Sequence, residues 1–130
     1  MKKKLWIGGH GSFGKLNSQV HSYDLETGEP GSTVDVGLMP IAIYSDDESP
    51  FLYALCHGNH SLYQIDKRTD EVIASLEVGE NPNAINGNDE QLFVTNLDGD
   101  SVSIINRSSF EIVNELKVPP GPYAIILEES

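Results

Sequence analysis

The sequence predicts an all-β chain built from three similar four-stranded units. Two observations lead to this prediction. A segment of about 40 residues repeats along the chain, and within it β-branched and aromatic residues alternate with polar ones between clusters of Gly, Pro, Asn and Asp. Helical periodicity is nearly absent. At 130 residues the chain has the length of one domain.

The repeat is clearest around a proline. Val36–Ile43 aligns with Val78–Ile85 at an offset of 42 residues, and the latter aligns with Val118–Ile125 at an offset of 40. Three segments in which a strand runs into a turn align at the same offsets. They are residues 23–27, 65–69 and 105–109. We therefore place the three units at residues 4–37, 38–79 and 80–118.

The third unit shows its strands most clearly. Leu92–Asn96 precedes a turn at Asp98-Gly99, and Val102–Ile105 and Glu111–Val118 follow this turn. The Pro-x-Ala-Ile segment that begins at Pro82 supplies the remaining strand. Four-stranded units that repeat near 40 residues are typical of a β-propeller, in which each unit forms one blade.

Several segments resemble the YVTN repeat propellers, whose units combine a Tyr-Val-Thr-Asn motif, a valine-rich strand and a Val-Gly pair with a following proline. They are Phe93–Asn96, Val102–Asn106 and Glu77–Gly79 with Pro82. The resemblance covers essentially the whole chain, although the first unit has Ile7-Gly8-Gly9 in place of the Thr-Asn pair. Asp24–Gly28 is also similar to the lactonase-type seven-bladed propellers. The resemblance implies a propeller fold, but it implies little about activity because members of the family do many different things.

A glycine-rich segment in the first unit matches parts of two phosphate-binding patterns. Gly9-x-Gly11-x-x-Gly14 fits the dinucleotide-binding pattern. Gly9-x-x-x-x-Gly14-Lys15 matches most of the P-loop pattern. Both patterns place the phosphate at a helix N-terminus. Leu16 stands where a P-loop has Ser or Thr, and Val20–Thr27 aligns with strand-and-turn segments. We therefore predict a long hairpin loop over residues 8–19.

The order of the strands predicts how the blades are completed. The strands of a blade are counted outward from the centre of the propeller. By this count the first unit begins with the second strand of its blade, and residues 122–128 supply an additional innermost strand after the third unit. We expect this closing strand to pair with Lys3–Gly8 of another copy, so that chains join head to tail in a ring. Two copies give six blades and three give nine. Propellers have about four to eight blades, which favours a homodimer, with a homotrimer possible.

The predicted seam between copies combines apolar and charged residues. Antiparallel pairing brings Glu128 and Glu129 near Lys2, Lys3 and Lys4 of the other copy. Exposed ion pairs contribute only ~0–1 kcal/mol each, so apolar burial is expected to hold the seam. The predicted seam residues are Lys3, Leu5, Ile7, Tyr123, Ile125, Leu127 and Glu128.

Polar residues are predicted around the central channel. The histidines lie at one mouth of it, and the other polar residues lie on the innermost strands and the loops that adjoin them. The candidate ligand-binding residues are His10, His57, His60, Glu80, Asn81, Asn83, Asn86 and Tyr123. Together with Asp98 and Asp100, the histidines could ligate a divalent metal, although their spacing is nonspecific. No catalytic residue is predicted, because Cys56 and His57 are neighbours on a strand and point to opposite faces.

Charge and composition narrow the function. The formal net charge of −12 argues against binding to nucleic acid or to anionic membranes. The single cysteine and the lack of a long apolar segment predict a cytoplasmic protein. We expect a non-catalytic binding or interaction module that needs no cofactor and holds a small molecule or a protein at its channel face. The alternative is a lactonase- or lyase-like enzyme whose histidines act at the same face, with or without a divalent metal.

Overall fold

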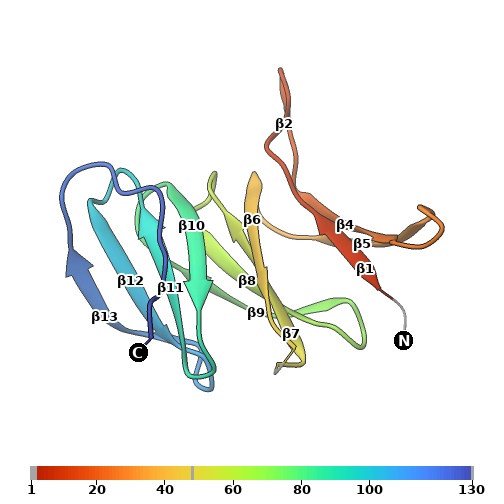
Figure 1. Ribbon diagram of the computed structural model, residues 1–130. Helices are drawn as coiled ribbons and strands as arrows, with labels where there is room; N and C mark the ends of the chain where they lie inside the picture. Colours follow the sequence, from red (N-terminus) through yellow and green to blue (C-terminus); the bar gives the residue numbers. More distant parts are fainter. Residues whose placement is uncertain (1–2, 48, 130) are drawn as a thin grey trace.

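The computed structural model describes residues 3–47 and 49–129, and these residues form thirteen β-strands in four antiparallel sheets. Three of the sheets stand side by side (Figure 1). Sheet 1 contains β1 (Lys4–Ile7), β4 (Gln19–Asp24) and β5 (Pro30–Asp35). Sheet 2 contains β6 (Pro40–Ser45), β7 (Phe51–Cys56), β8 (Ser61–Asp66) and β9 (Glu71–Glu77). Sheet 3 contains β10 (Pro82–Gly87), β11 (Gln91–Asn96), β12 (Ser101–Asn106) and β13 (Glu111–Lys117).

The prediction of an all-β chain is confirmed. No helix in the described ranges has the length and hydropathy needed to cross a bilayer. Sheets 2 and 3 repeat the same pairing: Leu52 lies opposite Ile65, and Leu92 lies opposite Ile105. Both sheets also have a bulge at the residue after the proline that starts the innermost strand. Residues in the same place of this register are called corresponding residues below.

The glycine-rich segment of the first unit forms a hairpin and not a phosphate-binding loop. Its short strands β2 (Gly11–Ser12) and β3 (Lys15–Leu16) form a separate sheet that projects beyond sheet 1 (Figure 1). Gly14 lies in its turn with a φ of 82°, which L side chains rarely adopt. The strand β4 follows, so no helix N-terminus is present at this loop.

The core lies between the sheets because successive side chains of each strand point to opposite faces. Leu52 and Ala54 of β7 face sheet 1, where they pack with Val20 and Val34. Tyr53 and Leu55 of the same strand face sheet 3 and are at most 1% exposed. The partners from sheet 3 in this second cluster are Leu92, Val94 and Ile105. Sheet 2 is therefore covered by an apolar layer on both faces.

We predict that Ile105→Ala lowers the free energy of unfolding by about 2–5 kcal/mol, because Ile105 is fully buried and its truncation leaves a cavity. Urea denaturation with linear extrapolation measures the change. The matched control is Ile73→Ala on β9, where the side chain is 50% exposed and the expected change stays within about 0.5 kcal/mol. Equal losses in the two variants would contradict the assignment of the core.

Candidate functional site

The same backbone arrangement precedes β6, β10 and the segment that follows sheet 3. Met39 before β6 has a φ of 59°, Asn81 before β10 has 50°, and Gly121 has 73°. Each of these residues donates its backbone N–H to the turn region of the preceding sheet. The acceptors are Asn17 O at 2.7 Å, His60 Nδ1 at 3.0 Å and Asp100 Oδ1 at 3.0 Å. The chain after Gly121 therefore starts in the same way as β6 and β10.

Two of the predicted ligand-binding histidines hold β10 against sheet 2. His57 Nδ1 lies 3.0 Å from the carbonyl oxygen of Pro82, so it carries the hydrogen that this oxygen accepts. His60 Nδ1 accepts the N–H of Asn81 and therefore carries no hydrogen. The Asn81 side chain donates a further hydrogen bond to Asp98. These contacts make the two histidines structural joints between sheets and leave only the Nε2 atom of each ring for another partner.

The remaining predicted ligand residues do not form one cluster. His10 and Glu80 are exposed, and Tyr123 is 65% exposed. Asn83 is buried, and its side-chain nitrogen has no hydrogen-bond partner. Asn86 lies near the opposite end of β10 from His57 and His60, about 13 Å along the strand from Pro82, and accepts the N–H of Gly87. Asn86 therefore lies on the innermost strand but apart from the two histidines.

The donor set gives the divalent-metal alternative no support. In residues 3–47 and 49–129, no three His, Cys, Asp or Glu side chains come together in a group that could hold a metal ion. His57 and His60 already use Nδ1 in hydrogen bonds to the protein.

Cys56 is not a nucleophile in this fold. Its side chain is fully buried, and burial raises the pKa of the thiol to about 11. Thiolate is the reactive form of cysteine, and at neutral pH almost none of it is present at such a pKa.

The predicted seam begins at an exposed edge of sheet 1. β1 pairs with β4 on one side, and no described residue pairs with its other edge. Leu5, Ile7 and Tyr23 are 48%, 47% and 37% exposed on the face turned away from sheet 2. Their corresponding residues in sheet 3 are Leu92, Val94 and Ile105, each 0% exposed. Sheet 1 thus exposes the face that sheets 2 and 3 bury against a preceding sheet.

The segment after Gly121, residues 122–129, is called the tail. It runs beside sheet 3 (Figure 1). Thr95 Oγ1 donates to Tyr123 O at 3.1 Å, and Asn88 Nδ2 donates to Glu129 Oε2 at 3.4 Å. Residues 122–128 were expected to form a strand, and in the single chain they form none, because no strand among the described residues pairs with them. Lys2, expected near the acidic tail of another copy, lies outside the described residues.

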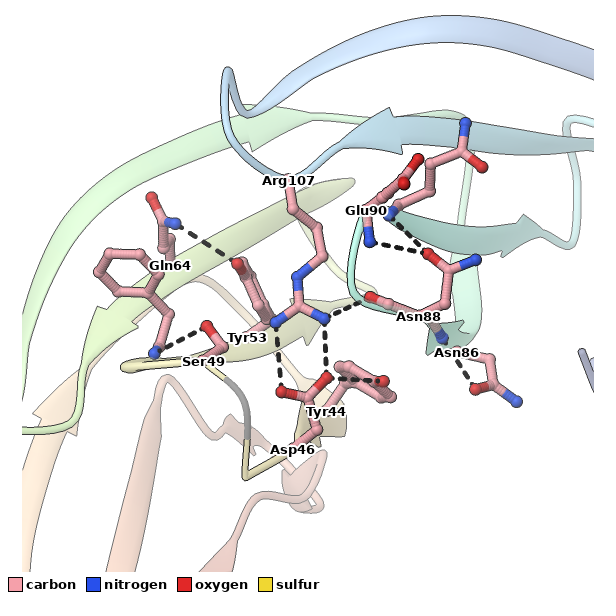
Figure 2. A network of polar contacts seen from close by, with 12 residues as sticks. Tyr44, Asp46, Ser49, Tyr53, Gln64, Asn86, Asn88, Glu90 and Arg107 are labelled. Carbon is pink, nitrogen blue, oxygen red and sulfur yellow. Dashed lines mark hydrogen bonds and ion pairs between the residues drawn. The ribbon is translucent and has the colours of Figure 1, made fainter.

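A polar cluster at the opposite ends of the strands links sheets 2 and 3 (Figure 2). The buried guanidinium of Arg107 lies 2.7 Å from Asp46 Oδ2 and donates to the carbonyl oxygen of Asn88 at 2.5 Å. It also lies over the rings of Tyr44 and Tyr53, with its central carbon 5.8 and 5.5 Å from their centroids. Burial is the largest single effect and works against the charge on Arg107, but the hydrogen bonds and charge interactions with Asp46 and Tyr53 together outweigh it, so the pKa of Arg107 is raised.

Sequence reasoning did not single out this cluster, although the repeat contains its signal. Arg107 corresponds to Lys67, so the second and third units share a basic residue after their third strand. Asp46 corresponds to Glu128, so an acidic residue recurs after two innermost segments. Only the stacking of the sheets shows that these two positions meet.

Comparison with solved structures identifies the fold. Hydrazine synthase of Kuenenia stuttgartiensis matches with a TM-score of 0.76 and 21% identity, over 81% of this chain and 31% of that chain. Apo AztD of Citrobacter koseri matches with a TM-score of 0.71 and 18% identity, over 91% of this chain and 36% of that chain. The dihydro-heme d1 dehydrogenase NirN, in complex with DHE, matches with a TM-score of 0.76 and 16% identity, over 90% of this chain and 26% of that chain. These are β-propeller proteins. The chain has a β-propeller fold.

The likeness to these solved structures concerns the fold. The chain spans about a third of the length of these proteins or less, and identities of this size establish the fold alone. No family model matches the chain, and no curated protein matches it either. The sheets are therefore propeller blades, and the activity has to be argued from the blades themselves.

We predict that the Cys56 thiol of the folded protein resists alkylation by iodoacetamide at pH 8, since it is buried and its pKa is about 11. The same protein in urea should react at the rate of a free thiol. Because the folded pKa is above that of the unfolded chain, this thiol also makes stability fall as the pH rises from about 9 towards 11. Rapid labelling of folded protein would contradict the prediction.

We predict that Arg107→Ala lowers the free energy of unfolding by about 3 kcal/mol. This is the lower end of the range for breaking a buried pair, because the Asp46 side chain keeps 25% of its exposure. The comparison variant is Arg68→Ala, which removes an arginine that is 81% exposed beside Asp66 and should have a much smaller effect. Similar urea midpoints for the two variants would show that Arg107 does not join the sheets.

Proposed function

We propose that this chain is a non-catalytic interaction module that assembles head to tail with further copies of itself into a β-propeller ring. The observation that carries the proposal is the exposed apolar face and free edge of sheet 1, which corresponds to a fully buried face in sheet 3. The tail of a second copy supplies the complementary element. It follows sheet 3 as β10 follows sheet 2, and Ile126 in it is 85% exposed.

The repeat defines the register of the proposed pairing. In sheet 2, Ile43 lies opposite Ala54, and in sheet 3, Ile85 lies opposite Val94. The corresponding pair is Ile125 of the tail with Ile7 of the receiving copy. The remaining pairs follow in antiparallel order: Ala124 with Gly8, Ile126 with Trp6 and Leu127 with Leu5. The tail keeps its place beside its own sheet 3, so joining requires no rearrangement.

Burial in the completed seam favours joining. Leu5, Ile7 and Tyr23 would be covered by sheet 3 and the tail of the other copy, as Leu92, Val94 and Ile105 are covered by sheet 2. Full burial of a large apolar side chain contributes roughly 1.5–3 kcal/mol. A ring of two copies has six blades, within the range of about four to eight, so we favour the dimer over a trimer of nine.

A ligand is proposed at the end of the ring where His57, His60 and Asn81 lie. The histidine Nε2 atoms and the exposed Glu80 offer polar contacts to a small molecule or to a protein loop. We further infer membership of the YVTN repeat propellers and a cytoplasmic location, on the sequence motifs described above. Native mass spectrometry of the purified chain tests for a copurified ligand together with the number of copies.

We predict that Ile7→Asp converts the oligomer to monomer, because a carboxylate would be buried without a partner in the seam. Light scattering after size-exclusion chromatography measures the mass, which for the wild-type dimer is twice the chain mass of 14.2 kDa. The matched control is Val113→Asp on β13, which is 56% exposed and lies away from the seam, and it should remain a dimer.

Deletion of residues 123–130 should likewise give a folded monomer, since it removes the complementary strand. A wild-type chain that runs as a monomer would overturn the proposed ring. A deletion variant that keeps the full oligomer mass would overturn the role of the tail.

A further inference from the structure

The Arg107 cluster joins sheet 3 to the preceding sheet, sheet 2. The basic side chain follows the third strand of its sheet and bonds the carbonyl oxygen of Asn88 in its own sheet. It then reaches the carboxylate of Asp46, which follows the innermost strand of the preceding sheet. Tyr44 and Tyr53 of that preceding sheet lie beneath it.

Lys67 occupies the corresponding place in sheet 2. Its backbone N–H donates to Pro50 O, as that of Arg107 donates to Glu90 O. Its Nζ donates to Asp46 O at 2.7 Å and to Ser49 O at 2.8 Å. Since Asp46 O corresponds to Asn88 O, the lysine charge lies where the Arg107 charge lies in sheet 3.

The carboxylate that would face Lys67 is that of Glu128. Asp46 is the second residue after Tyr44, and Glu128 is the second after the corresponding residue, Ile126. In the proposed ring the tail of a second copy takes the innermost place in sheet 1, which precedes sheet 2. Glu128 then lies beside Lys67, and Trp6 of the receiving copy takes the place of Tyr53. Tryptophan is the best aromatic partner for a cation.

The proposed ring has three kinds of junction, and each kind is matched in charge. The junction between sheets 2 and 3 joins Asp46 to Arg107. The junction between the tail-completed sheet 1 and sheet 2 would join Glu128 to Lys67. At the remaining junction, sheet 3 meets sheet 1 of the next copy. There Asn88 stands at the position of Asp46 and Leu25 at the position of Arg107, and both side chains are uncharged. Acid therefore meets base, or neutral meets neutral, at every junction.

We propose that an ion pair between Lys67 of one copy and Glu128 of the next fixes the register of the seam. This inference rests on the proposed head-to-tail ring and identifies the partner as the acidic tail of a second copy. A slip of one residue would turn the apolar side chains of the tail to the wrong face and would move Glu128 away from Lys67. The pair thus selects one register.

Charge reversal tests the pair. Because close charge pairs at interfaces contribute a few kcal/mol, Glu128→Lys alone and Lys67→Glu alone should each raise the dissociation constant of the oligomer at least about tenfold. An equimolar mixture of the two variants should restore it to within about threefold of wild type, since both seams of the mixed ring then join opposite charges. Sedimentation equilibrium measures the constants. The comparison variant is Glu129→Lys, which makes the same charge change one residue away. Glu129 is expected to face only exposed lysines at the start of the next copy, and exposed ion pairs contribute little, so its effect should stay below about threefold.

The outcomes separate this inference from the proposed ring. If wild type is monomeric, the ring and the ion pair both fail. If wild type assembles and Glu128→Lys behaves like Glu129→Lys, the ion pair is overturned while the ring stands, and the same holds if mixing restores nothing. Lys67→Glu also removes two hydrogen bonds within sheet 2, so its folding is checked by circular dichroism. Should it fail to fold, Glu128→Lys against Glu129→Lys decides, because both glutamates are exposed in the single chain.

Discussion

Coverage of the apolar faces of the sheets by neighbouring sheets is the constraint on which this structure depends. Alternating side chains give sheet 2 one apolar face towards Val20 and Val34 and another towards Leu92 and Val94. Contacts with neighbouring units supply much of the stability of such a stack. Sheet 1 has the same pattern, but among the described residues it has a neighbouring sheet on one side only, and Leu5 and Ile7 stay exposed on a strand whose other edge is unpaired there. The interaction proposed for this protein arises from that face.

Polar contacts at the two ends of the sheets have a different role, which is to set the spacing and direction of the stack. At one end His60 and Asp100 accept the N–H groups that begin the next innermost segment. At the other end Arg107 joins Asp46 across the boundary between sheets. His57 and His60, which were first considered as ligand-binding residues, thus have structural partners at the start of β10.

Much of the fold could be predicted from the sequence because the repeat places every strand in register. The Asp98-Gly99 turn and the hairpin at residues 8–19 were predicted correctly, since both follow from local turn chemistry and alignment. The candidate site was predicted less well. Arg107 was overlooked, because the position of a residue within a strand does not by itself identify its neighbours in the adjacent sheet.

The sequence by itself determined the number of units, the order of their strands and the alternation of apolar residues, all of which are local or periodic properties. The tertiary structure decided which residues meet between sheets: His57 with Pro82, Arg107 with Asp46, and the tail with Thr95. The physical reason is that such contacts join positions far apart in the chain, and their geometry exists only once the sheets are stacked.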